Sequence, residues 1–415
     1  MTGAVPLLLN QHTRLTKEHY KILLVSWAGW VFDFYDLILF SFLLGPIGTE
    51  LGLSRHRLSY VLGASLAATA LGGAVFGYLS DHFGRKRTLE LTILAYSLGT
   101  LLCGFAGSLP TLLAFRVITG LGVGGEWATG QTYVGETFPA QVRGRYGAFM
   151  QTGAPIGIAL ASVVGGFVAP LIGWRACFVL SFLPAMLVVY IRKALPESDL
   201  WERNRQRTTQ TSVNKFAVLL SPPHRKLFVF ALVLALFDMS AYWFTYAWLP
   251  SYLNEERHFS MSKSATWILV TQCGGLSGYL SFGFFADRYG RRLAFSVYSV
   301  LMAVGLLMVT LFWSAVVALP ALILFFMFLV GFGTGMFGGY GPLFSELFPT
   351  SIRSTAMGTA FNLARGVQFF TPLLITTIAE RYGLAGGISL AALFALLAGA
   401  WIWVFPETRG LVLND

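Results

Sequence analysis

The sequence predicts an all-α membrane protein of twelve spanning helices, arranged as two pseudosymmetric six-helix bundles. Three observations support this: an apolar composition along the whole chain, an uneven distribution of basic residues, and an internal repeat. The 415 residues are 55% hydrophobic and 12% charged, whereas a soluble domain carries about 25% charged residues. Because a spanning helix needs roughly 20 mainly apolar residues, twelve helices with their connections account for this length.

Charges, prolines and glycines divide the apolar sequence into these segments. Where no charge separates two neighbours, the breakers Pro110 and Pro320 set the boundary. The predicted spans cover residues 22–46, 58–80, 88–107, 110–136, 146–170, 174–194, 226–251, 264–286, 293–313, 318–345, 353–379 and 384–405. The first is longer than the apolar region of a signal peptide and lacks a small-residue cleavage site, so we expect a spanning helix there.

Basic residues gather on one side of the predicted spans. If the N-terminus lies inside, 21 of the 29 Lys and Arg residues fall in inner segments, six in outer loops and two within spans. This positive-inside pattern predicts a multi-pass protein of the inner or plasma membrane with both termini cytoplasmic. It explains the net charge of +10 by contact with a lipid bilayer rather than with nucleic acid.

The sequence lacks the usual marks of an enzyme or a metalloprotein. Cys103, Cys177 and Cys273 are scattered within predicted spans, which argues against disulfides and metal sites. We find no metal-ligand cluster, nucleotide loop or nucleophile–base pair, so we predict no enzymatic activity and no cofactor. A channel is disfavoured because channels usually assemble rings from several copies, whereas this chain carries its own internal symmetry and needs only a monomer.

Three sequence markers recur at nearly one spacing. The offsets are 206, 210 and 210 residues, and the paired segments are 77–87 with 283–292, 136–143 with 346–353, and 196–198 with 406–408. The halves are therefore parallel repeats, whose ligand site is expected between them near the bilayer midplane. The predicted divisions are an N-terminal half (1–194), a cytoplasmic linker (195–225) and a C-terminal half (226–415).

The first marker resembles a known family signature. Gly77-x-Leu-x-Asp81-x-x-Gly84-Arg-Lys-Arg, with its counterpart around Asp287, resembles the loop between the second and third helices of the major facilitator superfamily. The resemblance covers the whole chain. We expect the acidic and basic residues here either to latch neighbouring helix ends in one state and release them in another, or to anchor the helices at the headgroups.

Three further motifs narrow the resemblance. Asp33-Phe-Tyr-Asp36 lies in the first span, Gly124-Gly125-Glu126 in the fourth, and Asn362-Leu-Ala-Arg365 in the eleventh. Together they resemble the metabolite:proton symporters, most closely the sialate and lactate symporter branch. This resemblance implies alternating-access symport of a small organic acid anion with protons. Pro196-Glu-Ser and Pro406-Glu-Thr-Arg-Gly also resemble sugar porters, so a sugar:proton symporter remains the alternative, ahead of a drug exporter.

Six charged residues lie deep within the predicted spans, away from the span ends. A charge at lipid depth is costly, so each is a functional candidate. The cations are Arg116 and Arg365, and the anions are Asp33, Asp36, Glu126 and Asp238. If all ionise, two negative charges are uncompensated, and burial disfavours the charged form. We therefore expect at least one of these carboxyl groups to take up a proton.

Depth along the helices pairs some of these charges. At about 1.5 Å per residue, Asp36 and Arg116 reach one level of a core about 30 Å thick. They are predicted to form an ion pair that senses the proton, with a permanent structural salt bridge as the alternative. Asp33, Asp238 and Arg365 are predicted to share the midplane.

Arg365 is the predicted ligand of the substrate's carboxylate, because guanidinium matches a carboxylate with two parallel hydrogen bonds. The alternative is a permanent pair with Asp33 or Asp238. Asn362, one turn earlier, is a candidate for a substrate hydroxyl or carbonyl. Three other polar residues at suitable depth are further substrate candidates: Gln151, Gln272 and Tyr242.

The remaining charges are assigned to proton coupling and gating. Glu126 is either a second proton site or a partner of inner-loop arginines. Eight residues at the predicted cytoplasmic helix ends are the expected gate: Asp81, Arg85, Asp287, Arg291, Glu136, Arg143, Glu346 and Arg353.

Overall fold

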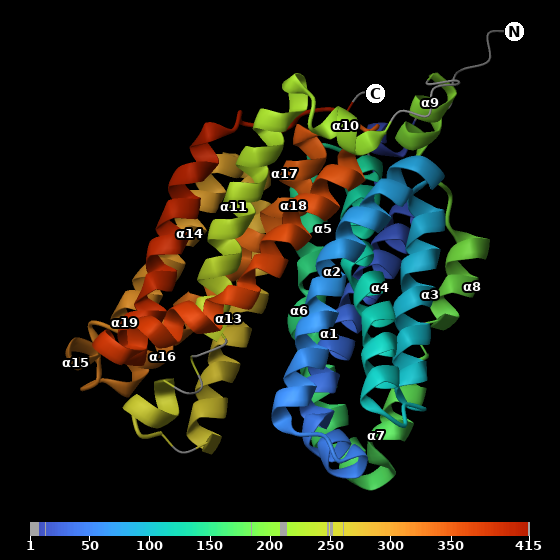
Figure 1. The fold of residues 1–415 in the computed structure, drawn as a ribbon. Helices are drawn as coiled ribbons and strands as arrows, with labels where there is room; N and C mark the ends of the chain where they lie inside the picture. Colours follow the sequence, from blue (N-terminus) through green and yellow to red (C-terminus); the bar gives the residue numbers. More distant parts are fainter. Residues whose placement is uncertain are drawn as a thin grey trace, which may run out of the picture.

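The computed structural model describes residues 8–12, 14–183, 185–207, 214–246, 249, 252–259 and 261–413. Their regular structure is helical, and the helices form two bundles that meet along one face (Figure 1). The prediction of an all-α fold of two helical halves is confirmed.

The N-terminal bundle contains the first six predicted spans. Its helices are α1 (Lys17–Leu51), α2 (Arg55–Phe83), α3 (Arg85–Cys103), α4 (Leu109–Thr137), α5 (Arg143–Gln151), α6 (Gly153–Val163), η2 (Val164–Val168), α7 (Ala169–Leu180) and α8 (Ala185–Ala194). The fifth span is thus built from α5, α6 and η2. Gly173, with φ of +81°, turns the chain between the fifth and sixth spans, because glycine accepts positive φ without steric cost.

The C-terminal bundle repeats this plan. Its elements are α11 (Pro222–Tyr246), η3 (Tyr252–Glu256), α13 (Met261–Tyr289), α14 (Arg291–Val309), α15 (Trp313–Val316), α16 (Pro320–Gly333), η4 (Thr334–Gly339), α17 (Tyr340–Leu347), α18 (Arg353–Val367), η5 (Gln368–Phe370), α19 (Thr371–Trp401) and η6 (Ile402–Val404). Gly383, with φ of +70°, separates the last two spans within α19, as Gly173 does in the other half.

Seven of the described helical segments are long and apolar enough to cross a membrane by length and composition alone. The other predicted spans are broken or carry charge. The fifth is interrupted at Thr152, the sixth at Phe182–Leu183, and the third begins with Arg85-Lys-Arg. Interrupted helices are tolerated at membrane depth where neighbouring protein satisfies the backbone.

In the chain, two short helices connect the bundles, α9 (Asp199–Arg207) and α10 (Lys215–Leu219). On α10, Phe216 stacks on Tyr78 of α2 with ring centroids 5.7 Å apart. The seventh span starts earlier than predicted, because prolines 222 and 223 fit the first turn of α11 rather than ending the linker. The domain boundaries stay predictions.

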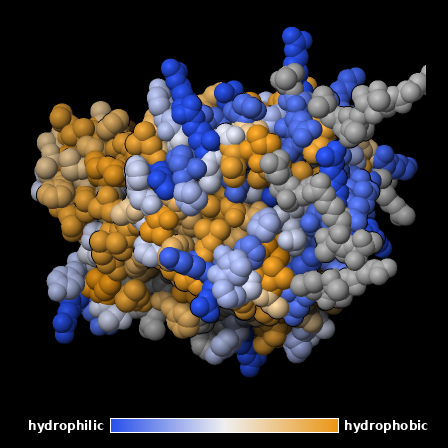
Figure 2. All heavy atoms as spheres, turned by 90° about the horizontal axis from the view of Figure 1, so that it is seen from above, coloured by the Kyte–Doolittle hydropathy of each residue, from blue (hydrophilic) through white to orange (hydrophobic). Residues whose placement is uncertain are grey.

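Both ends of the described chain lie at the same end of the molecule, called here the terminal end. The Asn10 amide donates to the Leu413 carbonyl at 3.4 Å, beside the short helix η1 (Leu9–Gln11). Seen from this end, hydrophilic residues gather toward the N-terminal bundle, whereas the flank of the C-terminal bundle is largely hydrophobic (Figure 2). An apolar flank is what contact with lipid requires.

Glycines bring the same pair of helices together in each half. A β-carbon on Gly124 of α4 would overlap the Thr69 carbonyl of α2, and one on Gly331 of α16 would overlap the Thr271 carbonyl of α13. Close backbone contact of this kind is how helices pack in lipid. The two contacts occupy equivalent places in the repeat, so the repeat extends to the packing of the helices.

Gly331→Ala is expected to destabilise the fold by about 1–3 kcal/mol, because the added methyl group forces α13 and α16 apart. Thermal unfolding of the detergent-purified protein measures this. Gly45→Ala is the matched control, since a β-carbon there meets nothing within 4 Å. Equal melting temperatures for the two variants would contradict the proposed close packing.

Candidate functional site

A cavity of 260 Å³ lies between the two bundles. Side chains of α1, α5 and α6 line it from one bundle, and side chains of α11, α13, η4 and α18 line it from the other. They are Trp30, Phe34, Leu37, Ile38, Gln151, Ala154, Ile158, Met239, Tyr242, Trp243, Tyr246, Ile268, Gln272, Tyr279, Phe337, Phe361 and Arg365. The interface between the repeats is the place where the sequence predicts the ligand site.

Arg365 is the charged residue of this lining. Its side chain is on α18 and the residue is only 8% exposed. Its guanidinium carbon lies 5.8 Å from the centre of the Phe34 ring, and within the described residues it has no hydrogen bond or ion pair. The alternative of a permanent pair with Asp33 or Asp238 is therefore absent from this state. Asp33 is nonetheless the carboxylate that acts on it most strongly.

Asp33 and Glu126 form a second unpaired group beside the cavity. All four carboxylate oxygens are buried and have no hydrogen-bond partner. Glu126 is the strongest charged neighbour of Asp33, followed by Arg365, and the Glu126 carboxylate packs directly over Gly29, one turn before Asp33. Among the described residues Glu126 makes no ion pair with an arginine, which was one of its two predicted roles, and the other role, a second proton site, stays a prediction.

Asp36 and Arg116 form the ion pair that their depths predict. Arg116 Nη1 lies 2.8 Å from Asp36 Oδ2, and both side chains are almost fully buried. The Thr100 hydroxyl donates to Asp36 Oδ1 at 2.5 Å, and the guanidinium carbon lies 4.3 Å from the centre of the Phe40 ring. The pairing is confirmed, and its role in proton coupling stays a prediction.

Asp238 lies elsewhere than expected. It faces the interior of the C-terminal bundle, where Asp238 Oδ2 accepts a hydrogen bond from the Tyr340 hydroxyl and Oδ1 has no partner. It does not line the cavity with Arg365. The depth of Asp238 was predicted from the sequence, but the rotation of α11 about its axis decides which way the side chain points. Its part in proton coupling stays a prediction.

Asn362 is also engaged away from the cavity. Its amide nitrogen donates to the Gly124 carbonyl at 2.9 Å and to the Gly358 carbonyl at 3.1 Å. Asn362 thus holds α18 against α4, where glycines allow close approach. In this state it is a contact between the halves rather than a lining residue, which differs from its predicted role as a substrate ligand.

The other predicted substrate candidates do line the cavity. Gln151 Oε1 accepts from the Trp127 indole at 2.9 Å and Nε2 donates to the Phe337 carbonyl at 3.3 Å, so this amide bridges the halves. Gln272 donates weakly to Thr271, at 3.5 Å. Tyr242 makes no hydrogen bond within the described chain, and its hydroxyl is available to a ligand.

Apart from Tyr242, the sequence reasoning did not identify the aromatic lining. Trp30 and Phe34 lie close to Asp33 in the sequence, and Phe361 precedes Asn362. These three aromatic residues could therefore have been proposed as lining residues from the motifs around Asp33 and Asn362. Phe337 and Tyr279 carried no such mark. Which aromatic rings face a cavity depends on how the two bundles pack, and one sequence does not give that.

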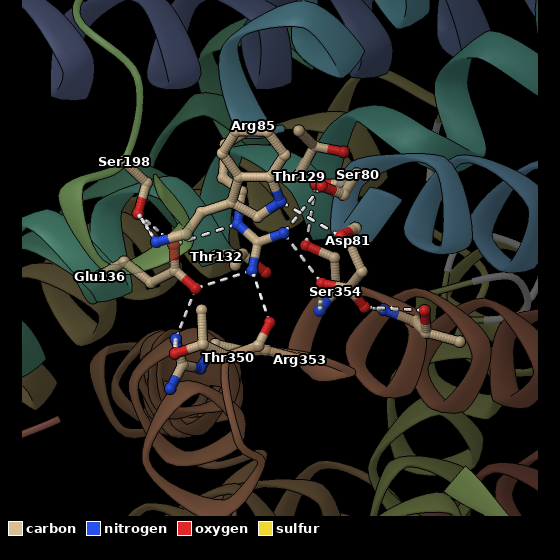
Figure 3. A network of polar contacts seen from close by, with 12 residues as sticks. Ser80, Asp81, Arg85, Thr129, Thr132, Glu136, Ser198, Thr350, Arg353 and Ser354 are labelled. Carbon is tan, nitrogen blue, oxygen red and sulfur yellow. Dashed lines mark hydrogen bonds and ion pairs between the residues drawn. The ribbon is translucent and has the colours of Figure 1, made fainter. Parts of the chain in front are cut away.

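Four of the predicted gate residues form one network at the terminal end (Figure 3). Arg85 lies 2.8 Å from Asp81 and 2.7 Å from Glu136, and Arg353 of the other half lies 2.5 Å from Glu136. The Ser198 hydroxyl also donates to Glu136, and Arg85 donates to the Thr350 carbonyl at 3.0 Å. Glu136 is therefore shared by arginines of both halves.

Asp81 joins the halves in a second way. Its carboxylate accepts from the backbone amides of Ser354 at 3.1 Å and Thr355 at 2.8 Å, and from the Thr355 hydroxyl at 2.7 Å. These amides open α18, and a carboxylate there satisfies unpaired donors and favours the helix dipole. An aspartate of one half thus caps a helix of the other.

The other four predicted gate residues repeat this network. Glu346 accepts from Arg291 of its own half at 2.9 Å and from Arg143 of the other half at 3.1 Å. Asp287 lies 2.7 Å from Arg291 and accepts from the amides of Gly144 at 3.0 Å and Arg145 at 2.9 Å, which open α5.

The described ion pairs between the halves all lie at the terminal end. They join Arg143 to Glu346, Arg353 to Glu136, and Arg145 to Asp287, the last at 3.6 Å. The terminal end of this structure is therefore closed. The gating role of these residues stays a prediction.

Comparison with known proteins assigns the fold to a family. The Major Facilitator Superfamily model matches residues 26–282, and the Sugar (and other) transporter model matches residues 202–415. Among solved structures, the proton:xylose symporter XylE aligns over 95% of this chain and 98% of its own, with a TM-score of 0.78 and 22% identity. That likeness supports the fold alone.

Curated relatives cover nearly the whole chain. A putative metabolite transport protein of Haemophilus influenzae is 31% identical over 95% of this chain and 98% of its own. A probable 4-methylmuconolactone transporter of Cupriavidus pinatubonensis is 32% identical over 96% and 93%, and the Escherichia coli sialic acid transporter NanX is 31% identical over 91% and 93%. The chain is a multi-pass membrane transporter, not an enzyme, and it belongs to the major facilitator superfamily.

Proposed function

We propose that this transporter is a proton-coupled symporter of a small organic acid anion. The observation that carries the proposal is Arg365, a buried guanidinium in the cavity between the halves with no partner among the described residues. A buried ion without a partner costs several kcal/mol. A substrate carboxylate relieves that cost with two parallel hydrogen bonds, so the empty site favours an organic anion.

The names of relatives support this substrate class. They include transporters of 4-methylmuconolactone, sialic acid and cis,cis-muconate. The family model for sugar transporters and the XylE fold favour the alternative, a sugar:proton symporter. A neutral sugar would leave the Arg365 charge unpaired, and a lipophilic cation would be repelled by it, so the anion explains the cavity better than a sugar or an exported drug.

The Asp33–Glu126 pair supports the proton half of the proposal. Two buried carboxylates side by side cannot both ionise without large repulsion, so the pair holds at least one proton. In the empty site an ionised Asp33 offsets the charge of Arg365. When the substrate carboxylate binds Arg365, it neutralises the nearby cation that favours an ionised Asp33, so Asp33 takes up a proton. Asp36–Arg116 is the second proposed proton-sensing pair.

Alternating access follows from the same arrangement. With both termini cytoplasmic in an inner or plasma membrane, as proposed from the positive-inside pattern, the closed terminal end is the cytoplasmic one. Opening it requires the Glu136 and Glu346 networks to separate. The protein then works as a monomer, driven by the proton gradient and without a cofactor.

Arg365→Ala is expected to lower proton-driven uptake of an organic anion at least about tenfold, since a hydrogen bond to a charged group contributes about 1.5–3 kcal/mol. Uptake of a panel of radiolabelled organic anions, including lactate, benzoate and sialate, into proteoliposomes with an inward proton gradient measures this. Arg381→Ala, at an exposed position, is the control. Uptake of a neutral hexose that Arg365→Ala leaves unchanged would refute the anion proposal.

Asp33→Asn is expected to abolish accumulation against a gradient while leaving exchange of substrate across the membrane intact, because the variant binds substrate without taking up a proton. Substrate counterflow at equal pH and uptake under a pH gradient separate the two activities. The exposed Glu380→Gln serves as the control. Proton-driven accumulation at the wild-type level in Asp33→Asn would argue against this residue as the coupling site.

Glu136→Gln is expected to shift the protein toward a state open at the terminal end, because it weakens the pairs with Arg85 and Arg353. Spin labels on Arg87→Cys and Arg288→Cys, exposed positions of opposite halves, report the separation in a background lacking the native cysteines. A longer-distance population should grow several-fold. An unchanged distance distribution would mean that Glu136 does not hold the gate.

A further inference from the structure

The walls of the cavity around Arg365 are unusually rich in aromatic rings for a site that also carries a charge. Trp30 and Phe34 of α1 form one side, and Tyr242, Phe337 and Phe361 form the other. Among the lining residues that the structure describes, Arg365 is the single charged side chain. A ligand in this cavity would contact one guanidinium group and the faces of several aromatic rings.

The rings stand next to the guanidinium rather than at a distance from it. The Phe34 ring lies 5.8 Å from the Arg365 guanidinium carbon and packs edge-to-face on Trp30, with ring centroids 4.8 Å apart. Across the cavity, Tyr242 and Phe337 pack edge-to-face at 5.6 Å. A carboxylate held by Arg365 would therefore place its attached carbon skeleton between aromatic walls contributed by the two halves.

The polar groups left for the rest of a ligand include the Tyr242 hydroxyl and the Gln272 amide. The Gln151 amide is already used by Trp127 and the Phe337 carbonyl, so it would have to break those bonds to serve a substrate. An acid with more hydroxyl groups than these can satisfy would bury the others without partners, which is costly. The cavity of 260 Å³ is also smaller than the roughly 300–1,000 Å³ typical of sites for drug-sized ligands.

We infer that the substrate is a small planar monocarboxylate with an aromatic or conjugated skeleton. Its carboxylate binds Arg365, and its flat face packs against Phe34 and the rings of the C-terminal half. One carboxylate matches the single charged lining residue, whereas a second would be buried unpaired. This inference rests on the proposed organic-anion transport and makes Phe34 a specificity-determining residue.

Binding of three acids to the detergent-purified protein, measured by isothermal titration calorimetry, tests the inference. Benzoate is expected to bind about three- to tenfold more tightly than cyclohexanecarboxylate, the saturated acid of similar size, because an aromatic pair adds about 0.5–1.5 kcal/mol beyond burial. Terephthalate, which adds a second carboxylate to the same ring, is expected to bind at least tenfold more weakly than benzoate.

Phe34→Leu is expected to remove the preference for benzoate over cyclohexanecarboxylate while both acids still bind. Phe167→Leu, at a position 74% exposed, is the matched control and should keep the preference. Phe34→Tyr retains an aromatic ring and should keep it as well, which separates loss of stacking from loss of folding.

The outcomes distinguish this inference from the proposal beneath it. Equal binding of benzoate and cyclohexanecarboxylate, or tighter binding of sialate than of either, with Arg365→Ala abolishing binding, would overturn the planar-acid inference and leave organic-anion transport standing. Binding of no acid, or binding that Arg365→Ala does not change, would overturn the proposed function itself.

Discussion

The cost of holding a charge away from water is the constraint on which the rest of this structure depends. At the terminal end, Arg85, Arg291 and Arg353 are buried and each meets a carboxylate within 3 Å. Deeper in the membrane, Arg116 is held by Asp36 in the same way. Against this background of satisfied pairs, the unpartnered Arg365 and the Asp33–Glu126 pair are exceptions. A buried charge without a partner is costly. These exceptions lie at one cavity, whereas a further buried carboxyl without an ion-pair partner, Asp238, lies inside the C-terminal bundle.

The internal repeat accounts for the helix arrangement and for the contacts at the terminal end. The charged residues at the cavity do not follow the repeat. Asp81 and Asp287 each cap a helix of the opposite half, so the closed end is built twice from one pattern. At the positions equivalent to Arg365, residues 155–159 read Pro-Ile-Gly-Ile-Ala and carry no charge. The ion pairs that close the terminal end are therefore symmetric, and the proposed ligand site is not. One half provides the cation, and the other provides the carboxyl pair that responds to it.

Sequence reasoning reached what depends on depth and composition. The Asp36–Arg116 pair follows from where the two residues fall along helices of known rise. The charged residues at the terminal end follow from the repeated motifs, although the sequence did not show how they pair across the halves. It failed where the direction of a side chain mattered. Asp238 turns into its own bundle toward Tyr340 and Asn362 packs on Gly124. Those contacts depend on how each helix is rotated about its axis and on how the two halves pack together. Both are set by many weak side-chain contacts, which cannot be read from a single sequence.

Charge balance links the proposed substrate to the proposed proton. With the site empty, ionised Asp33 offsets Arg365. With an anion bound, the anion offsets Arg365 and Asp33 is neutral, so the cavity carries the same net charge in both states. An anion without a proton, or a proton without an anion, leaves one uncompensated charge in a medium where it is costly. Opening the terminal end requires breaking buried ion pairs, which is costly in itself. An uncompensated charge in the cavity adds to that cost, so the states with an anion alone or a proton alone change conformation least readily. Coupling then needs no direct contact between the cavity and the gate.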